Sequence, residues 1–170
     1  MILAEDLQLL RRFQTAVAQA GIEIVDSYVS MTELSEYAAD VPEKMQQMRL
    51  YPNLPPKGKP AWCFYPMSKR RNVDQNWFTL PFEKRRELMY AHGTTGRTFA
   101  GRILQLVTGS TGVDDFEWGV TLFGAHLDDL KKVVYVMRYD KASADYGEFG
   151  TFYTGVHDTV DVVLDQVGIG

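Results

Sequence analysis

From residue 61 onward the hydrophobic pattern switches between two periods in a fixed order, and this order constrains the fold more than any other feature of the sequence. Runs of alternating apolar and polar residues predict strands, and apolar residues spaced three and four apart predict helices. A turn rich in Gly, Ser and Asp joins the second strand to the third, as in a hairpin. The strands are expected at 61–68, 101–108, 116–123 and 149–156, and the helices at 81–93 and 127–139.

The order strand, helix, strand, strand, helix, strand is that of a split βαββαβ unit, so we expect an α+β fold of the ferredoxin-like type. Pro66 lies inside the first strand. Because proline has no backbone N–H to donate, its presence favours an edge strand or a bulge at that point.

The residues before this unit carry a shorter pattern. Apolar spacing predicts a helix over 3–20, alternation predicts a strand over 23–30, and a short helix over 31–37 follows. A proline-rich loop then ends at Pro60. The helix and strand look like the last third of a second ferredoxin-like unit. We therefore divide the chain into a partial N-terminal unit with its connecting loop, 1–58, and a C-terminal ferredoxin-like domain, 59–170.

Composition excludes several classes of function. The net charge is −4 and the one basic cluster spans only residues 69–71, so a nucleic-acid-binding face is not expected. A single cysteine, Cys63, excludes a disulfide framework and a cysteine-rich metal site. Charged residues interrupt the N-terminus, so it does not read as a secretory signal, and no apolar run is long enough to cross a membrane. We expect a soluble cytoplasmic protein.

Three histidines are present, and none has the spacing of a zinc motif. His92 lies near the predicted end of a helix and is followed by Gly93 and Gly96, where missing side chains would let a flat group approach. One neutral imidazole is the common proximal ligand of heme iron. The alternative is a structural histidine that interacts with the last carbonyls of the helix.

Other polar residues fall on predicted strand faces. Tyr65, Met67 and Lys69 alternate along the first strand and should share one face, either as the wall of a pocket or as a solvated edge. Gln105 should point away from its apolar neighbours, either into solvent or into a pocket. Arg138, Asp140 and Ser143, near the end of the last helix, are candidates for an anion site or simply for a favourable helix terminus.

One known family contains stretches similar to FYPMSKRR, NWFTLP, HGTTGR, TGSTGVDDFEWGVTLF and MRYDKASADYGEFGTFYTG. Over about residues 26–155 the chain resembles the coproheme decarboxylase branch of the chlorite-dismutase-like family. The resemblance implies a ferredoxin-like, heme-binding domain of the dimeric α+β barrel type with a role in heme b synthesis. Subunits of that family have two ferredoxin-like halves, and this chain is expected to begin inside the first.

The family's reaction uses hydrogen peroxide to remove carbon dioxide from two propionates of iron coproporphyrin III (coproheme), through a tyrosyl radical, and gives heme b. By position, the resemblance implies that His92 is the proximal iron ligand, Tyr65 the radical residue and Lys69 the lysine near the reacting propionate. It implies porphyrin contacts from six further residues: Arg49, Tyr51, Met67, Gln105, Arg138 and Ser143.

Gln105 also discriminates within the family, since chlorite dismutases resemble this pattern but place arginine there. A neutral amide stabilises an oxychlorine anion less well than a cation does, so we rank chlorite breakdown below decarboxylation. Two further interpretations stay open: a heme-binding or sensing protein without turnover, and a ferredoxin-like oligomeric binding module without heme. The resemblance implies coproheme and hydrogen peroxide as substrates and a homo-oligomer, a pentamer, as the assembly.

Overall fold

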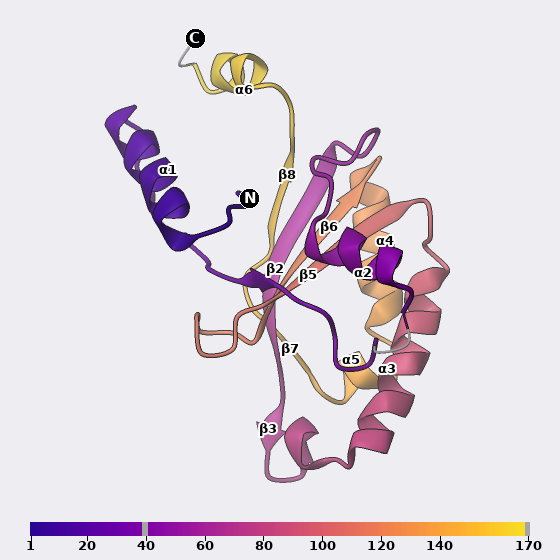
Figure 1. Cartoon of the computed structure of the whole chain (residues 1–170). Helices are drawn as coiled ribbons and strands as arrows, with labels where there is room; N and C mark the ends of the chain where they lie inside the picture. Colours follow the sequence, from indigo (N-terminus) through magenta and orange to yellow (C-terminus); the bar gives the residue numbers. More distant parts are fainter. Residues whose placement is uncertain (39–40, 169–170) are drawn as a thin grey trace.

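A computed structural model describes residues 1–38 and 41–168, and an antiparallel sheet forms its centre (Figure 1). The sheet has the order β1-β5-β6-β2-β7, and β8 also pairs with β2. The strands are β1 (Met31–Thr32), β2 (Ala61–Lys69), β5 (Ile103–Gly109), β6 (Trp118–Gly124), β7 (Gly147–Phe149) and β8 (Tyr153–Val156), with a small separate pair, β3 (Arg71–Asn72) and β4 (Gln75–Asn76). The helices are α1 (Leu7–Gln19), α2 (Glu43–Leu50), α3 (Phe82–Arg97), α4 (Leu127–Met137), α5 (Lys141–Ala144) and α6 (Val160–Gln166), with a 3₁₀ turn at Trp77–Thr79.

The ferredoxin-like unit predicted from residue 61 is confirmed. Strand β2 leads through α3 to the hairpin β5–β6, in which Gly109 pairs with Trp118, and α4 leads on to β7 and β8. The sheet order β5-β6-β2 followed by β7 and β8 places the first and third strands of the unit side by side, as the split βαββαβ arrangement requires.

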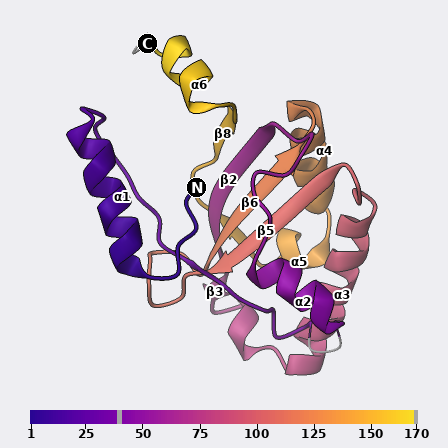
Figure 2. The ribbon, with the colours of Figure 1, turned by 45° about the horizontal axis from the view of Figure 1, so that its top comes forward.

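One face of this sheet carries the main core. Side chains at alternate positions of β2 and β6 pack there against α4, while Trp77, Leu88 and Ala142 form a second cluster between α3 and α5. Both views place α3 and α4 on this side of the sheet, which we call the helical side (Figure 2). The buried residues of the main core are Ala61, Cys63, Tyr65, Phe99, Val120, Leu122, Leu130 and Val133.

The last predicted strand, 149–156, is in fact two strands, because a bulge interrupts the pairing with β2. Met67 pairs with Phe149, and Cys63 pairs with Thr154. The partner chain therefore advances five residues while β2 advances four, which is one extra residue. Pro66 faces this bulge. It does not lie on an edge strand, because β2 pairs on both of its sides.

The N-terminal expectations are partly wrong. The helix over 3–20 is confirmed as α1, which begins where the Asp6 carboxylate accepts a hydrogen bond from the Leu9 N–H (2.9 Å). Residues 23–30 form no strand, and in place of the helix over 31–37 there is the short strand β1. Helix α2 lies inside the predicted loop, of which residues 39–40 fall outside the described part of the chain.

Side chains dock the 28–30 segment onto the β5–β6 hairpin in place of a backbone ladder. The Tyr28 hydroxyl bonds the Ser110 hydroxyl, and the Ser30 hydroxyl lies 2.7 Å from that of Thr108. The Val29 N–H donates to Asp114 Oδ2 at 2.8 Å. Alternation in this segment therefore reflects a docked chain rather than a paired strand.

Helices α1 and α6 contain no buried residue, and they stand away from the sheet in both ribbon views. Among the helices of the described residues, none combines the length and apolar character needed to span a bilayer.

Candidate active site

His92 projects from the middle of α3, not from its end. The helix was predicted to stop near Gly93, but it continues to Arg97, and the Thr94 hydroxyl bonds the Tyr90 carbonyl one turn back. Gly96 lies four residues after His92 and so on the same helical face. A side chain added at Gly96 would meet no atom within 4 Å. The helix surface next to His92 is therefore open.

A buried carboxylate fixes the His92 ring. Nδ1 lies 2.7 Å from Asp140 Oδ2, and the Asp140 side chain is only 4% exposed. The same oxygen accepts the Ser143 N–H (3.1 Å) and so caps the start of α5. Because a carboxylate accepts hydrogen bonds, this contact favours a proton on Nδ1 and leaves the lone pair on Nε2. Among the described residues no hydrogen-bond partner of Nε2 is found. Sequence reasoning gave Asp140 no such role.

Lys69 is buried, so the solvated alternative for it is wrong. Its Nζ donates to the Ala142 carbonyl in α5 at 2.7 Å and lies 4.5 Å above the centre of the Trp77 ring. Burial lowers the pKa of Lys69 to about 8, and the Asp140 and Glu117 carboxylates oppose part of that shift. The amine therefore points toward the elements that hold His92.

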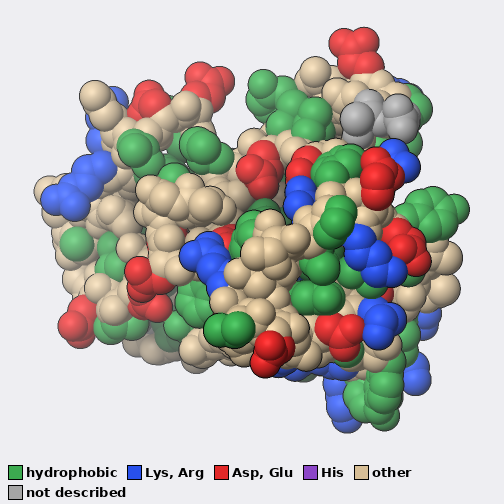
Figure 3. Space-filling model, turned by 90° about the horizontal axis from the view of Figure 1, so that it is seen from below, with side chains coloured by type: hydrophobic (Ala, Val, Ile, Leu, Met, Phe, Trp, Pro, Cys, Tyr) green, Lys and Arg blue, Asp and Glu red, His purple; other side chains and the backbone are tan. Residues whose placement is uncertain are grey.

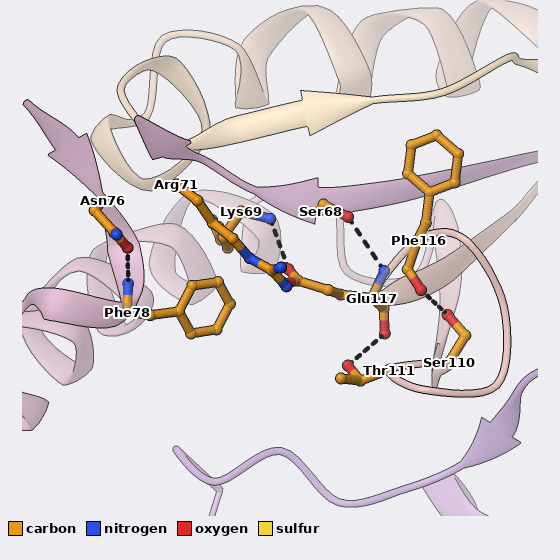
Figure 4. A network of polar contacts seen from close by, with 9 residues as sticks. All are labelled: Ser68, Lys69, Arg71, Asn76, Phe78, Ser110, Thr111, Phe116 and Glu117. Atoms are coloured by element: carbon orange, nitrogen blue, oxygen red, sulfur yellow. Dashed lines mark hydrogen bonds and ion pairs between the residues drawn. The ribbon is translucent and has the colours of Figure 1, made fainter. Parts of the chain in front are cut away.

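Glu117 anchors the strand that carries Lys69 (Figure 4). Its buried carboxylate accepts the Lys69 backbone N–H (2.8 Å) and pairs with the Arg71 guanidinium. Its own backbone N–H donates to the Ser68 hydroxyl at 3.2 Å. These contacts hold the loop before β6 against the end of β2.

Tyr65, Met67 and Lys69 share the helical side of β2, as predicted, because Tyr65 and Met67 pair across with core-facing positions of β6. The Tyr65 ring is 8% exposed and stacks on Phe152, with ring centres 4.4 Å apart and planes 21° apart. Phe149 lies 5.8 Å from the same ring. Burial raises the pKa of the Tyr65 phenol, so the ring stays protonated at neutral pH.

Gln105 also lies on the helical side, because it pairs with the buried Leu122, which in turn pairs with Cys63. Gln105 itself is exposed, and so is Val107 on the same face. Strand β5 therefore presents exposed side chains on the helical side of the sheet.

The remaining predicted residues lie around this region to different degrees. Ser143 is buried, and its hydroxyl lies 3.5 Å from His92 Nδ1. The Arg138 guanidinium sits over the Phe149 ring at 4.1 Å, beside Tyr65. Arg49 and Tyr51, at the end of α2, are exposed, and no contact joins them to the other predicted site residues in the described part of the chain.

The described residues on one face of the molecule form no patch of a single charge. Basic and acidic side chains are interspersed on the face seen from below (Figure 3). One hollow in the described surface is lined by residues around Glu117 and another by the start of α4, and neither includes His92 or Gln105.

Comparison with known proteins bears on this arrangement. A profile of the chlorite dismutase family matches residues 1–158. The chain belongs to the chlorite dismutase family. Within that family, the coproheme decarboxylase of Staphylococcus saprophyticus is 51% identical over 145 residues, which cover 82% of this chain and 57% of the relative. The chain therefore spans little more than half the length of that relative.

Solved structures share the fold. A heme-binding protein from Thermus thermophilus superposes with a TM-score of 0.89 at 37% identity, over 96% of this chain and 68% of that one. A chlorite dismutase variant from Candidatus Nitrospira defluvii gives a TM-score of 0.72 at 22% identity, over 96% and 69%. The second likeness supports the fold alone.

Proposed function

We propose that this chlorite dismutase family member binds iron coproporphyrin III through His92 and carries out its peroxide-dependent oxidative decarboxylation to heme b. The observation that carries the proposal is the geometry of His92. A buried carboxylate holds its Nδ1 (2.7 Å), and open helix surface lies beside it. The identity to a coproheme decarboxylase and the likeness to a heme-binding protein support this ligand over other flat molecules.

The residues on the helical side suit an iron porphyrin with acidic substituents. His92 would offer Nε2 to the iron, because Asp140 engages Nδ1. Gln105, exposed on β5, would supply a neutral hydrogen-bond donor and acceptor to the site. We assign propionate contacts to Arg138 and Ser143 and, from α2, to Arg49 and Tyr51. Met67 would line the wall beside Tyr65.

Each decarboxylation balances with one peroxide. A propionate loses carbon dioxide, a proton and two electrons to become a vinyl group, and the two electrons reduce hydrogen peroxide to two waters. Hydrogen peroxide is the oxidant, and an iron porphyrin held by His92 would activate it. Tyr65 would lose a proton and an electron from its phenol, the electron going to the peroxide oxidant, and would then take a hydrogen atom from the propionate carbon, which restores the phenol. The carbon radical that remains would give a second electron to the same oxidant as carbon dioxide leaves, and the vinyl group results. Lys69 would balance the charge of the reacting carboxylate, a role that its pKa of about 8 permits at neutral pH.

Gln105 favours this reaction over chlorite breakdown, because an amide lacks the fixed positive charge that would stabilise an oxychlorine anion. We also propose a cytoplasmic location and assembly with further copies of the chain. A heme-binding or sensing role without turnover remains the second candidate. It is favoured by the exposed position of Arg49 and Tyr51, which leaves one side of the proposed site without contacts.

Absorbance and porphyrin mass together test the proposal. We expect the chain to bind iron coproporphyrin III with a Soret shift and to convert it to heme b when peroxide is added. His92→Ala should lose the Soret shift of a histidine-ligated iron. Tyr65→Phe keeps the ring shape, so it should bind normally and give neither heme b nor the singly decarboxylated porphyrin.

Three results would contradict the proposal. An unchanged spectrum for His92→Ala would remove the iron ligand, and full conversion by Tyr65→Phe would remove the radical relay. Binding without any conversion by the parent chain would leave the heme-binding role alone.

A further inference from the structure

The bulge between β7 and β8 lies directly opposite Tyr65. If the register of Met67 with Phe149 continued without interruption, residue 151 would face Tyr65, and Phe152 would point to the other side of the sheet. The observed register beyond the bulge pairs Phe64 with Tyr153 and Cys63 with Thr154. The extra residue therefore turns Phe152 to the helical side.

This turn places two aromatic rings on one phenol. Phe149 approaches Tyr65 at 56° to its plane, and Phe152 stacks nearly parallel to it at 4.4 Å. An unbulged strand brings only every second residue to a given face, so Phe149 and Phe152, three apart, could not both reach Tyr65 from it. Phe152 itself is 38% exposed, so its outer side is in contact with solvent.

Two local features hold the bulge in place. The Gly150 N–H donates to the Pro66 carbonyl at 2.8 Å. A side chain at Gly150 would meet Pro66 Cγ at 2.7 Å and Phe116 Cζ at 2.8 Å, so the chain approaches β2 here only as glycine. Pro66 offers no N–H to a partner strand, which removes one reason for regular pairing at this point.

We propose that Phe152 is a positioning residue for Tyr65: the bulge exists to lay this ring on the phenol, fix its orientation and keep water from that face. For its consequence in turnover the inference rests on the proposed function. For the ordering and shielding of Tyr65 it stands on the chain alone. A reactive phenol gains from both effects, since a fixed ring keeps its distance to the substrate, and a dry surface keeps the oxidised ring from solvent.

Nitration with tetranitromethane in the chain without porphyrin tests the shielding. Tyr90 and Tyr135, which are 73% and 56% exposed, serve as internal standards, and peptide mass spectrometry reads each site. We expect Tyr65 to react slower than both standards, by about tenfold for each unit that burial raises the pKa of a phenol. Phe152→Leu should bring Tyr65 close to the standards, while Phe152→Trp, which restores a stacking ring, should keep it protected.

The control is Phe78→Leu, which removes a similarly exposed ring that makes no contact with Tyr65. It should leave the nitration of Tyr65 as in the parent. The inference fails if Phe152→Leu leaves Tyr65 as slow as the parent, or if Phe152→Trp exposes it as fully as leucine does. It also fails if Phe152→Leu unfolds the chain by circular dichroism, because Phe152 would then act on the fold and not on Tyr65.

A second arm uses iron coproporphyrin III and peroxide. Phe152→Leu should bind the porphyrin with affinity equal to the parent, and its conversion should slow by about tenfold to a hundredfold, as expected for a misplaced reacting group. Phe152→Trp should recover most of the rate, and Phe78→Leu should not lose any. Parent-like conversion by Phe152→Leu contradicts the inference. If the parent itself converts nothing, the proposed function fails, and the nitration experiment still decides the role of Phe152.

Discussion

At the scale of single residues, Lys69 shows how the fold resets the chemistry of a side chain. Its amine is enclosed between the Trp77 ring and the Ala142 carbonyl, and burial lowers its pKa to about 8. An unfolded chain would return it to the ordinary value of 10.5. Between these two values the unfolded state binds more protons than the folded state, so stability must rise with pH.

Lys69→Met should abolish this dependence. In the parent, the contribution of Lys69 to the free energy of unfolding is fully present above pH 10.5 and is lost as the pH falls to about 8. The slope reaches at most about 1.4 kcal/mol per pH unit. Methionine does not titrate. The unfolding free energy of the parent minus that of the variant, measured with urea from pH 7 to 10.5, should therefore become more positive as the pH rises. Lys131→Met, which replaces an exposed lysine, is the control. If the difference in unfolding free energy between the parent and Lys69→Met does not change with pH, the pKa of the Lys69 amine is not lowered in the folded chain.

Sequence reasoning reached some of these residues and not others, for physical reasons. Tyr65, Met67 and Lys69 could be grouped because a strand repeats every two residues, and the register confirms it. The contact of Asp140 with His92 could not, because 48 residues separate them and only the packing of α5 against α3 joins them. Phe152 was hidden because a single extra residue in the partner chain reverses the face it points to.

At the scale of secondary structure elements, the bulge leaves little room for an added side chain. Gly150→Ala would place a methyl group 2.7 Å from Pro66 Cγ and 2.8 Å from Phe116 Cζ, between two side-chain rings. We expect a loss of about 1–3 kcal/mol, as for other overpacked sites, measured by urea unfolding.

The matched control for Gly150→Ala is Gly96→Ala, in helix α3, where the added carbon meets nothing within 4 Å. Removing a helical glycine should stabilise the chain by up to about 1 kcal/mol. Equal effects of the two substitutions would mean that the bulge has no special packing requirement.

The elements could be predicted where regular backbone hydrogen bonding accompanies a long hydrophobic repeat. The hairpin β5–β6 and helix α4 lie close to their expected ranges because long alternating and helical periods leave little choice. The strand over 23–30 was wrong because side chains such as Tyr28 and Ser30 dock that segment without a ladder. Helix α3 is longer than predicted. Gly93 and Gly96 suggested its end, but the threonines between them bond helical carbonyls one turn back and the helix continues.

At the scale of the whole molecule, stability is distributed unevenly. The sheet core joins β2, β5, β6 and α4, whereas α1 buries no side chain and the 28–30 segment is held by a few hydroxyl and carboxylate contacts. We expect amide hydrogens of α1 to exchange with solvent orders of magnitude faster than those of β6, since segments without buried contacts open locally. Exchange followed by mass spectrometry measures this. Equal protection of α1 and β6 would show that the chain opens only as one unit.

The division of the chain near residue 58 stays a prediction.

The shared oxygen of Asp140 has a consequence for how binding and folding communicate. Oδ2 contacts the His92 imidazole and accepts the Ser143 N–H in the first turn of α5, so the start of one helix and the orientation of a side chain on another depend on a single atom. A ligand that binds His92 must then also affect the hydrogen bond between the Ser143 N–H and Asp140 that caps α5. By thermodynamic reciprocity, unfolding of α5 should weaken ligand binding by the same free energy by which the bound ligand changes the stability of α5. The stability of the short helix α5 should therefore report whether a ligand is bound at His92.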